Sequence, residues 1–228
     1  MKRLIYLFLL ISLPLFSFET TNLQLLYSNN FDGDAFIYDT KSGEKTTLTF
    51  EHYRTFDYGD FFMFADIMTG KKFDGTSSGV YTELAPRFSL SKLSNSDYSF
   101  GPIKDVYIAT QVNLGRSYDA YLYGLAVDLE VPGFNVFSIN AYNKEENIYN
   151  DDTYQITPVY ETKSLYGVHL SGFIDLTKRD ISTHNQLLYN VDTKNQTFVG
   201  IEWLYYKYNY QGSRSKTSVI QAMVKYKF

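Results

Sequence analysis

The sequence predicts an all-β fold: a transmembrane antiparallel β-barrel of about twelve strands that follows an N-terminal signal peptide. The first observation is the start of the chain, which has the features of a signal for export. The second is an aromatic-rich composition, with 22 tyrosines and 18 phenylalanines. The third is an alternation of apolar and polar residues over about twelve segments, and an even strand number is typical of bacterial outer-membrane barrels.

The N-terminal segment, residues 1–18, is predicted to be a secretory signal peptide. Two basic residues precede an apolar run from Leu4 to Leu13, and small and polar residues follow it. This run is shorter than the ~20 apolar residues that a spanning helix needs, which favours a cleaved signal over an anchor. We expect cleavage near Ser17 to Thr20, so that residues 19–228 form the barrel as a single domain.

The rest of the chain contains no cysteine, although export leads to compartments in which disulfides form. Its stability must therefore come from other interactions. Removing Lys2 and Arg3 from the 21 basic residues leaves 19 against 25 acidic ones, a net charge of about −6. This acidic balance gives no indication of nucleic-acid binding.

Alternation predicts the strands one by one. In the segment that starts at Val106, Val106 and Ile108 share one face, whereas Gln111 and Asn113 share the other. Alternation is also expected in a soluble β-sandwich, but many segments reach the ~9–11 residues of a tilted membrane strand. The predicted strands are 22–28, 45–53, 58–67, 80–91, 104–115, 119–131, 134–143, 153–161, 164–176, 184–191, 196–209 and 217–228.

The connections between these segments alternate in length, as they do in barrels with short periplasmic turns and long outer loops. The tight joints fall at 54–57, 132–133, 162–163 and 193–195, and the longer links at 29–44, 68–79, 144–152 and 177–183. Two connections depart from this pattern, because 116–118 is short where a loop is due and 92–103 is long where a turn is due.

The segment TELAPRFSLSKL, residues 82–93, is informative about the interior of the barrel. Its alternation places Glu83 and Arg87 in the lumen, where charges are tolerated, and Pro86 on the lipid face. Since proline has no N–H for the ladder, we expect a bulge or local bend there. Together with the two preceding strands, this segment gives a set of lumen-facing candidate ligand-binding residues: Glu51, Tyr53, Asp60, Phe62, Phe64, Asp66, Tyr81, Glu83 and Arg87.

Carboxylates beside aromatic faces suit a polar solute that contains a ring. The ring stacks on phenylalanine or tyrosine, and the carboxylates accept hydrogen bonds from its hydroxyl groups. The alternative is that these charges pair across the lumen and only stiffen the barrel.

The segment PRFSLSKLSNSDYSFGPIK, from Pro86 to Lys104, resembles the pattern PRFSxxKLxxxDxSFGPxK of the nucleoside-specific outer-membrane channels, the Tsx-like family. The resemblance implies a monomeric twelve-stranded barrel in the outer membrane of a Gram-negative bacterium, through which nucleosides diffuse without a cofactor. The carried-over residues are Pro86, Arg87, Phe88, Ser89, Lys92, Leu93, Asp97, Ser99, Phe100, Gly101, Pro102 and Lys104. Most of them are expected to fix the connection after the fourth strand, with Gly101 and Pro102 forming a turn.

The last strand ends in Phe228, as in many outer-membrane barrels, and we expect the barrel-assembly machinery to recognise this segment. Three other functions stay open at this stage. These alternatives are a general small-solute porin, a surface receptor and an embedded lipid-modifying enzyme. The enzyme alternative rests on His169 and Ser171, which share one face of a strand, but that face is the lumen. The spacing of the histidines indicates no zinc site.

Overall fold

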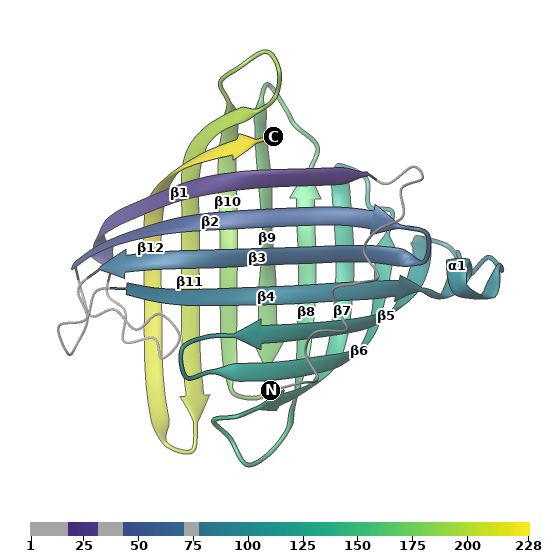
Figure 1. Cartoon of the computed structure of the whole chain (residues 1–228), viewed down its shortest axis with the longest axis horizontal. Coiled ribbons are helices and arrows are strands. Elements are labelled where there is room, and N and C mark those ends of the chain that lie inside the picture. The colour runs from purple at the N-terminus through teal and green to yellow at the C-terminus, as the bar shows by residue number, and fades with distance from the viewer. Residues whose placement is uncertain (1–17, 32–42, 71–77) are drawn as a thin grey trace, which may run out of the picture.

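A computed structural model describes residues 18–31, 43–70 and 78–228, so the predicted signal peptide, apart from Phe18, lies outside the described residues. The described residues form a closed barrel with twelve antiparallel strands and one short helix, which confirms the predicted fold class (Figure 1). No helix in these ranges is long and apolar enough to cross a membrane. The elements are β1 (Glu19–Phe31), β2 (Gly43–Phe56), β3 (Gly59–Gly70), β4 (Ser78–Ser89), α1 (Leu90–Ser94), β5 (Ile103–Leu114), β6 (Asp119–Leu129), β7 (Phe134–Glu146), β8 (Thr153–Thr162), β9 (Val168–Thr177), β10 (Asp180–Asn190), β11 (Thr197–Tyr210) and β12 (Ser213–Lys227).

Each strand pairs with its neighbours in the chain, and β1 pairs with β12 to close the barrel, from Asn22 opposite Lys227 to Tyr27 opposite Ala222. In Figure 1 the strands β1 to β5 run across the front of the barrel and cross β8 to β11 behind them at a steep angle. Strong tilt of this kind is what closure of a sheet requires, and closure leaves no unpaired strand edge.

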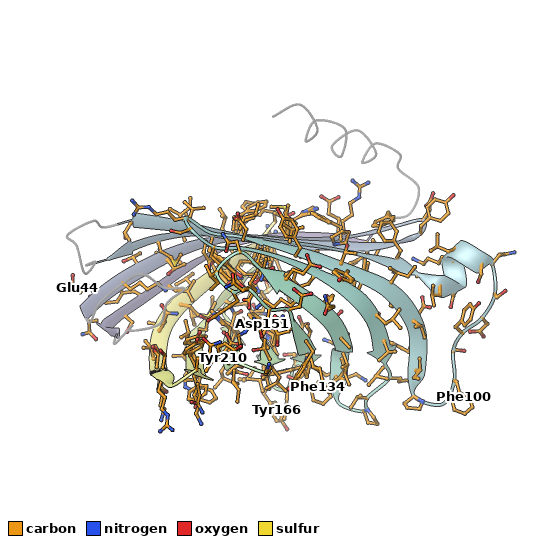
Figure 2. All side chains as sticks on the ribbon, turned by 90° about the horizontal axis from the view of Figure 1, so that it is seen from below. Glu44, Phe100, Phe134, Asp151, Tyr166 and Tyr210 are labelled. Atoms are coloured by element: carbon orange, nitrogen blue, oxygen red, sulfur yellow. The ribbon has the colours of Figure 1, made fainter. Side chains whose placement is uncertain are left out.

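The two faces of the strands have opposite chemistry. On β12, Gln221 and Lys225 are buried in the interior, whereas Val224 and Tyr226 are exposed on the outside. The same division holds on β1, where Gln24 points inward, and Figure 2 shows side chains on both faces of the wall. A soluble sandwich would bury its apolar face, so this arrangement of polar inside and apolar outside belongs to a barrel surrounded by lipid.

The connections follow the predicted alternation only in part, and two predicted connections are corrected. The tight joint predicted at 162–163 is wrong, because β8 ends at Thr162 and β9 begins only at Val168. We call the end of the barrel where β1 begins and β12 ends the terminal rim, and the opposite end the loop rim. The predicted long link at 177–183 is wrong, because β9 ends at Thr177 and β10 already begins at Asp180. The Thr177 hydroxyl accepts the backbone N–H of Arg179 at 2.9 Å and of Asp180 at 3.0 Å, which fixes a tight turn.

The long connection at 92–103 is confirmed and lies on the terminal rim, where α1 protrudes from the end of β4 (Figure 1). Ser89 caps α1, because its Oγ accepts the Lys92 N–H at 3.0 Å and donates to Asp105 at 2.6 Å. Gly101 has a φ of +56° between the bridged residues Phe100 and Ile103. The residues of the family pattern thus build this connection, as the sequence predicted.

Of the bulge or local bend expected at Pro86, the bulge is wrong. Pro86 pairs with Phe61 of β3 without a change of register. On the β5 side the ladder is interrupted at Ala85 and Pro86, but the pairing of Leu84 with Val112 and of Arg87 with Ala109 has the same register. The missing N–H therefore costs ladder contacts on one side only, while the Pro86 carbonyl accepts the Thr110 hydroxyl at 3.2 Å.

A turn on the terminal rim, between β10 and β11, is organised by Asp192. Its carboxylate accepts the backbone N–H of Lys194 at 2.7 Å, of Gln196 at 3.1 Å and of Thr197. Hydrogen bonds from the Thr197 side chain and from these backbone groups favour the ionised form, so the pKa of Asp192 is lowered to about 2. The turn therefore keeps its anchor over the whole physiological pH range.

We expect the replacement Gly124→Ala to destabilise the barrel by about 1–3 kcal/mol, the usual cost of overpacking. Gly124 lies on β6, and a Cβ atom there would stand 1.9 Å from the backbone oxygen of Ala141 on β7, so the two strands would have to separate. Urea unfolding of the protein refolded in lipid vesicles measures this. The matched control is Gly115→Ala, where the nearest atoms lie at 3.5 Å and no change is expected. Equal stability of the two variants would contradict the prediction.

Candidate functional site

All nine candidate residues lie on the inward face of three adjacent strands, β2, β3 and β4. Cross-strand pairs place several of them side by side: Glu51 is opposite Phe64, Phe64 is opposite Glu83, and Asp66 is opposite Tyr81. The register predicted from alternation is therefore correct in these strands. Their surroundings divide the candidates into two groups, those held in ion and amide networks and those that line open space.

Arg87 belongs to the first group. Its guanidinium donates to both carboxylate oxygens of Asp60, at 2.9 and 2.7 Å, and to Asp128 of β6 at 2.9 Å. The guanidinium carbon of Arg87 lies 4.4 Å from the centroid of the Tyr107 ring. The Tyr107 hydroxyl donates to Asp128 at 3.0 Å. We call these four residues the terminal-rim cluster. Arg87 and Asp60 thus compensate each other's charge through paired hydrogen bonds.

Glu51 is also engaged, in what we call the seam network, since it bridges the junction of β1 and β12. The Glu51 carboxylate accepts Asn22 at 2.7 Å and lies 3.4 Å from the Lys225 ammonium. Hydrogen bonds continue through Gln24 and Gln186 to Glu202, so that five strands are joined. The members are Asn22, Gln24, Glu51, Gln186, Glu202, Gln221 and Lys225. Tyr53 is the remaining candidate near the terminal rim, and the centroid of its ring lies 6.1 Å from that of Phe18.

An aromatic wall runs from β3 toward the loop rim. Neighbouring ring centroids are 6.2 Å apart between Phe62 and Phe64, 5.9 Å between Phe64 and Tyr81, and 6.5 Å between Tyr81 and Tyr118. Polar groups accompany the rings, because the Glu83 carboxylate accepts the Tyr81 hydroxyl at 2.6 Å. This wall offers successive faces on which a flat ring can stack.

Opposite this wall, β9 and β10 carry a second stacked pair. The rings of Phe173 and His184 are nearly parallel, at 13°, with centroids 5.1 Å apart. Between the two walls lies a cavity of about 40 Å³, which we call the waist. Its lining combines the wall residues with carboxylates and a lysine: Phe64, Asp66, Tyr81, Glu83, Asn113, Tyr118, Lys144, Phe173, Asp175, Asp180, Ser182 and His184.

The sequence prediction missed the residues of the far wall. Alternation did put the face of β9 that holds Phe173 and Asp175 into the lumen, but it gave no indication that this face meets β3 and β4. The contact arises only when the barrel closes, because β9 stands halfway round it. No local pattern in the sequence carries that information.

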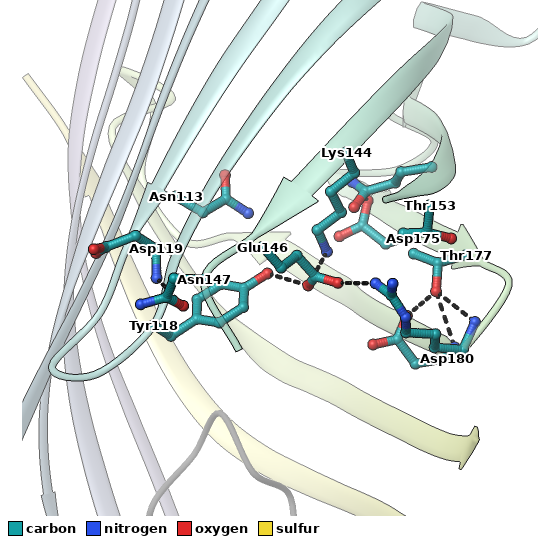
Figure 3. A network of polar contacts seen from close by, with 12 residues as sticks. Asn113, Tyr118, Asp119, Lys144, Glu146, Asn147, Thr153, Asp175, Thr177 and Asp180 are labelled. Carbon is teal, nitrogen blue, oxygen red and sulfur yellow. Dashed lines mark hydrogen bonds and ion pairs between the residues drawn. The ribbon is translucent and has the colours of Figure 1, made fainter. Parts of the chain in front are cut away.

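Toward the loop rim, the Glu146 carboxylate at the end of β7 collects three donors (Figure 3). Tyr118 donates its hydroxyl at 2.7 Å, the Lys144 ammonium lies at 3.1 Å, and Arg179 makes a further ion pair. We call these four residues the loop-rim knot. Tyr118 and Lys144 also line the waist, so the knot borders the cavity directly.

Acidic side chains outnumber basic ones on the inward face of the described strands and turns. The acidic ones are Glu51, Asp60, Asp66, Glu83, Asp105, Asp128, Glu146, Glu161, Asp175, Asp180 and Glu202, and the basic ones are Lys45, Arg87, Lys144, Arg179, Lys225 and Lys227. Across residues 18–31, 43–70 and 78–228, no three histidine or carboxylate side chains converge in the geometry of a metal site. His169 packs edge-on against Phe198 in the lumen, at 5.3 Å, away from the lipid.

Comparison with known proteins places the chain in context. A family model described as "Nucleoside-specific channel-forming protein, Tsx" matches residues 22–228. The Tsx protein of Escherichia coli O157:H7 is 30% identical over 169 residues, which cover 63% of this chain and 57% of that protein. The outer membrane protein OmpK of Vibrio parahaemolyticus is 28% identical over 104 residues, 42% of this chain and 40% of that protein. The chain thus matches 57% of the length of the first of these relatives and 40% of the length of the second.

Among solved structures, the KdgM porin superposes with a TM-score of 0.54 at 14% sequence identity. The superposition covers 92% of this chain and 99% of that porin. A second structure of that porin, in complex with disordered oligogalacturonate, gives a TM-score of 0.53. At this level of identity the likeness concerns the barrel fold alone.

Proposed function

The chain belongs to the Tsx family of nucleoside-specific channel-forming proteins and is an outer-membrane β-barrel, and from this premise we propose that it conducts nucleosides by facilitated diffusion. The observation that carries the proposal is the waist, where an aromatic wall and a stacked Phe173–His184 pair face each other across a space lined by carboxylates. A base stacks on the rings, and ribose hydroxyls donate to Asp66, Glu83 or Asp175.

Of the nine candidates, five fit this role best by position: Phe62, Phe64, Asp66, Tyr81 and Glu83, which stand on the aromatic wall or in the waist. Glu51, Asp60 and Arg87 hold the barrel together through the seam network and the terminal-rim cluster, and they act on the solute only through the shape of the lumen. Tyr53 stands nearer the terminal rim, where it offers a further stacking surface after the waist.

Passage requires side-chain movement. A cavity of about 40 Å³ has room for a few water molecules and is too small for a nucleoside. The solute therefore advances by displacing water and by shifting lining side chains that lie outside the loop-rim knot. Several weak stacking positions suit such transport, because a solute must bind well enough to enter and loosely enough to leave. No energy source or cofactor is needed for downhill diffusion.

The test is single-channel conductance of the refolded protein in a planar bilayer. Nucleosides added at rising concentration are expected to block the ionic current saturably, whereas neutral sugars and amino acids of similar size leave it unchanged. Conductance without such a block would contradict the proposed transport of nucleosides and indicate a general small-solute pore.

We expect the open channel to pass potassium several-fold more readily than chloride. The excess of carboxylates on the lumen wall raises the local concentration of cations and disfavours anions. Under a KCl gradient the dilute side should become positive, and the reversal potential measures the ratio. A dilute side that becomes negative would contradict this prediction. The same acidic lumen disfavours an acidic ligand such as oligogalacturonate, which binds the KdgM porin of the same fold.

The surroundings of the barrel give two further partners. The apolar outer face is covered by outer-membrane lipid. Phe228 at the end of the chain packs its ring 5.3 Å from Tyr226 and donates its backbone N–H to Thr21 of β1 at 2.9 Å. We assign this segment as the one that the barrel-assembly machinery recognises, and the barrel as a monomer.

A further inference from the structure

Glu146 joins parts of the loop rim that are distant in the sequence. Its side chain, only 5% exposed, accepts hydrogen bonds from Tyr118 in the β5–β6 turn and from Arg179 in the β9–β10 turn. The Lys144 ammonium, from its own strand, lies on the same carboxylate oxygen as Tyr118. One carboxylate therefore holds two turns, four strands apart in the wall, over the same stretch of lumen.

Arg179 is fixed from its other side as well. Its side chain is 1% exposed and lies 3.0 Å from the Asp151 carboxylate, in the loop between β7 and β8. The guanidinium packs over the ring of Tyr149 at 4.1 Å and of Tyr210 at 5.3 Å, and these two rings meet edge-on at 5.8 Å. The loop-rim knot thus ties in the β7–β8 loop and the end of β11.

The knot also determines what stands in the path of a solute. Tyr118 and Lys144 belong both to the knot and to the lining of the waist, and Asp180, next to Arg179, lines the waist too. With Glu146 in place, the Tyr118 ring and the Lys144 chain are held across the lumen. Without its charge, the ion pairs with Lys144 and Arg179 would be lost, and the hydrogen bond from Tyr118 would no longer be strengthened by a charged acceptor, so these side chains would be held less firmly.

We propose that Glu146 is a specificity-determining residue of this channel, which sets the width of its entrance by holding Tyr118, Lys144 and Arg179 together. The inference rests on the proposed function only in that the barrel conducts solutes at all. The ion pairs of Glu146 hold these side chains firmly because they are buried, and removing one partner of a buried ion pair leaves an uncompensated charge. The Asp151 arm of Arg179 is more exposed and contributes less.

The test compares Glu146→Gln, which keeps the size of the side chain but removes the charge, with the unaltered protein. We expect a higher single-channel conductance in KCl and a shift of the exclusion limit to larger neutral sugars in liposome-swelling assays. Glu146→Asp keeps the charge and should restore part of the discrimination. The matched control is Glu145→Gln on the same strand, whose side chain is exposed on the outer face and accepts the Tyr123 hydroxyl at 3.0 Å.

If Glu146→Gln does not fold, as judged by heat-modifiable migration on gels, Tyr118→Phe removes a single donor from the knot and should widen the entrance to a smaller extent. Folded variants with unchanged conductance and an unchanged exclusion limit would overturn the inference. These readouts contain no nucleoside, so a widened entrance supports the role of Glu146 even where nucleosides fail to block, and a nucleoside block with no widening supports the proposed function alone.

Discussion

Replacing Arg87 by alanine is expected to lower the free energy of unfolding by about 3–5 kcal/mol, the cost of leaving buried charges without their partner. The Arg87 side chain is 14% exposed, and it neutralises Asp60, at 5%, and Asp128, at 24%. Its removal leaves two carboxylates close together in a poorly hydrated part of the lumen. It also exposes the face of the Tyr107 ring that the guanidinium covers.

Equilibrium unfolding in urea, with the protein in lipid vesicles, measures the loss. Trp203 is the single tryptophan of the sequence and faces outward, so its fluorescence reports the transition. Arg87→Lys keeps the charge but cannot form the paired hydrogen bonds to Asp60. Its free energy of unfolding should lie between those of the unaltered protein and the alanine variant. A double change of Arg87→Met with Asp60→Asn should recover part of the stability. A loss below about 1 kcal/mol for the alanine variant would place the terminal-rim cluster among weak surface ion pairs.

The second large effect concerns ligand affinity. We expect Phe64→Ala to raise the nucleoside concentration for half-maximal block about tenfold to a hundredfold. Loss of one aromatic platform costs about 1–3 kcal/mol per stacked base, and each 1.4 kcal/mol is a factor of ten. Phe64 is the chosen position because its ring lines the waist and continues on both sides to Phe62 and Tyr81. The double change at Phe62 and Phe64 should lower nucleoside flux further.

The matched control is Phe61→Ala, three residues earlier on β3, whose side chain points to the opposite face of the same strand. It loses the same number of atoms but should leave the block unchanged. The current in KCl alone should not fall in Phe64→Ala, since the change opens space in the lumen. An unchanged half-blocking concentration in a folded Phe64→Ala variant would remove the aromatic wall from the site.

Most of the correct predictions from the sequence rest on the alternation of apolar and polar residues along the strands. It located all twelve strands and put every one of the nine candidates on the correct face, because the lumen and the lipid impose opposite chemistry on alternate residues. It could not decide which inward charges are satisfied. Arg87 and Glu83 are both charged residues on the inward face of β4, but Arg87 pairs with the charges of Asp60 and Asp128, whereas Glu83 accepts hydrogen bonds from uncharged Tyr81 and Gln111 and lines the waist. That difference depends on contacts across the lumen.

The errors have local causes. Pro86 was expected to cause a bulge or local bend, yet its pairing with β3 keeps the register on the side where no N–H is required. The link at 177–183 was expected to be long, yet the side chain of Thr177 closes it within two residues. In both places, a hydrogen bond from one side chain or one neighbouring strand decided the backbone geometry, and composition does not specify it.

The seam network has a consequence for the time course of folding. The Lys225–Glu51 contact joins residues 174 positions apart, and the Gln24–Gln186 contact joins residues 162 apart. Contacts of this separation form only after the intervening chain has been ordered, and they make folding slow. The first and last strands must therefore wait for each other, and until they meet both present open edges. Substitutions that weaken the seam network would prolong the time before β1 and β12 pair, and the partly folded chain would be more prone to aggregation.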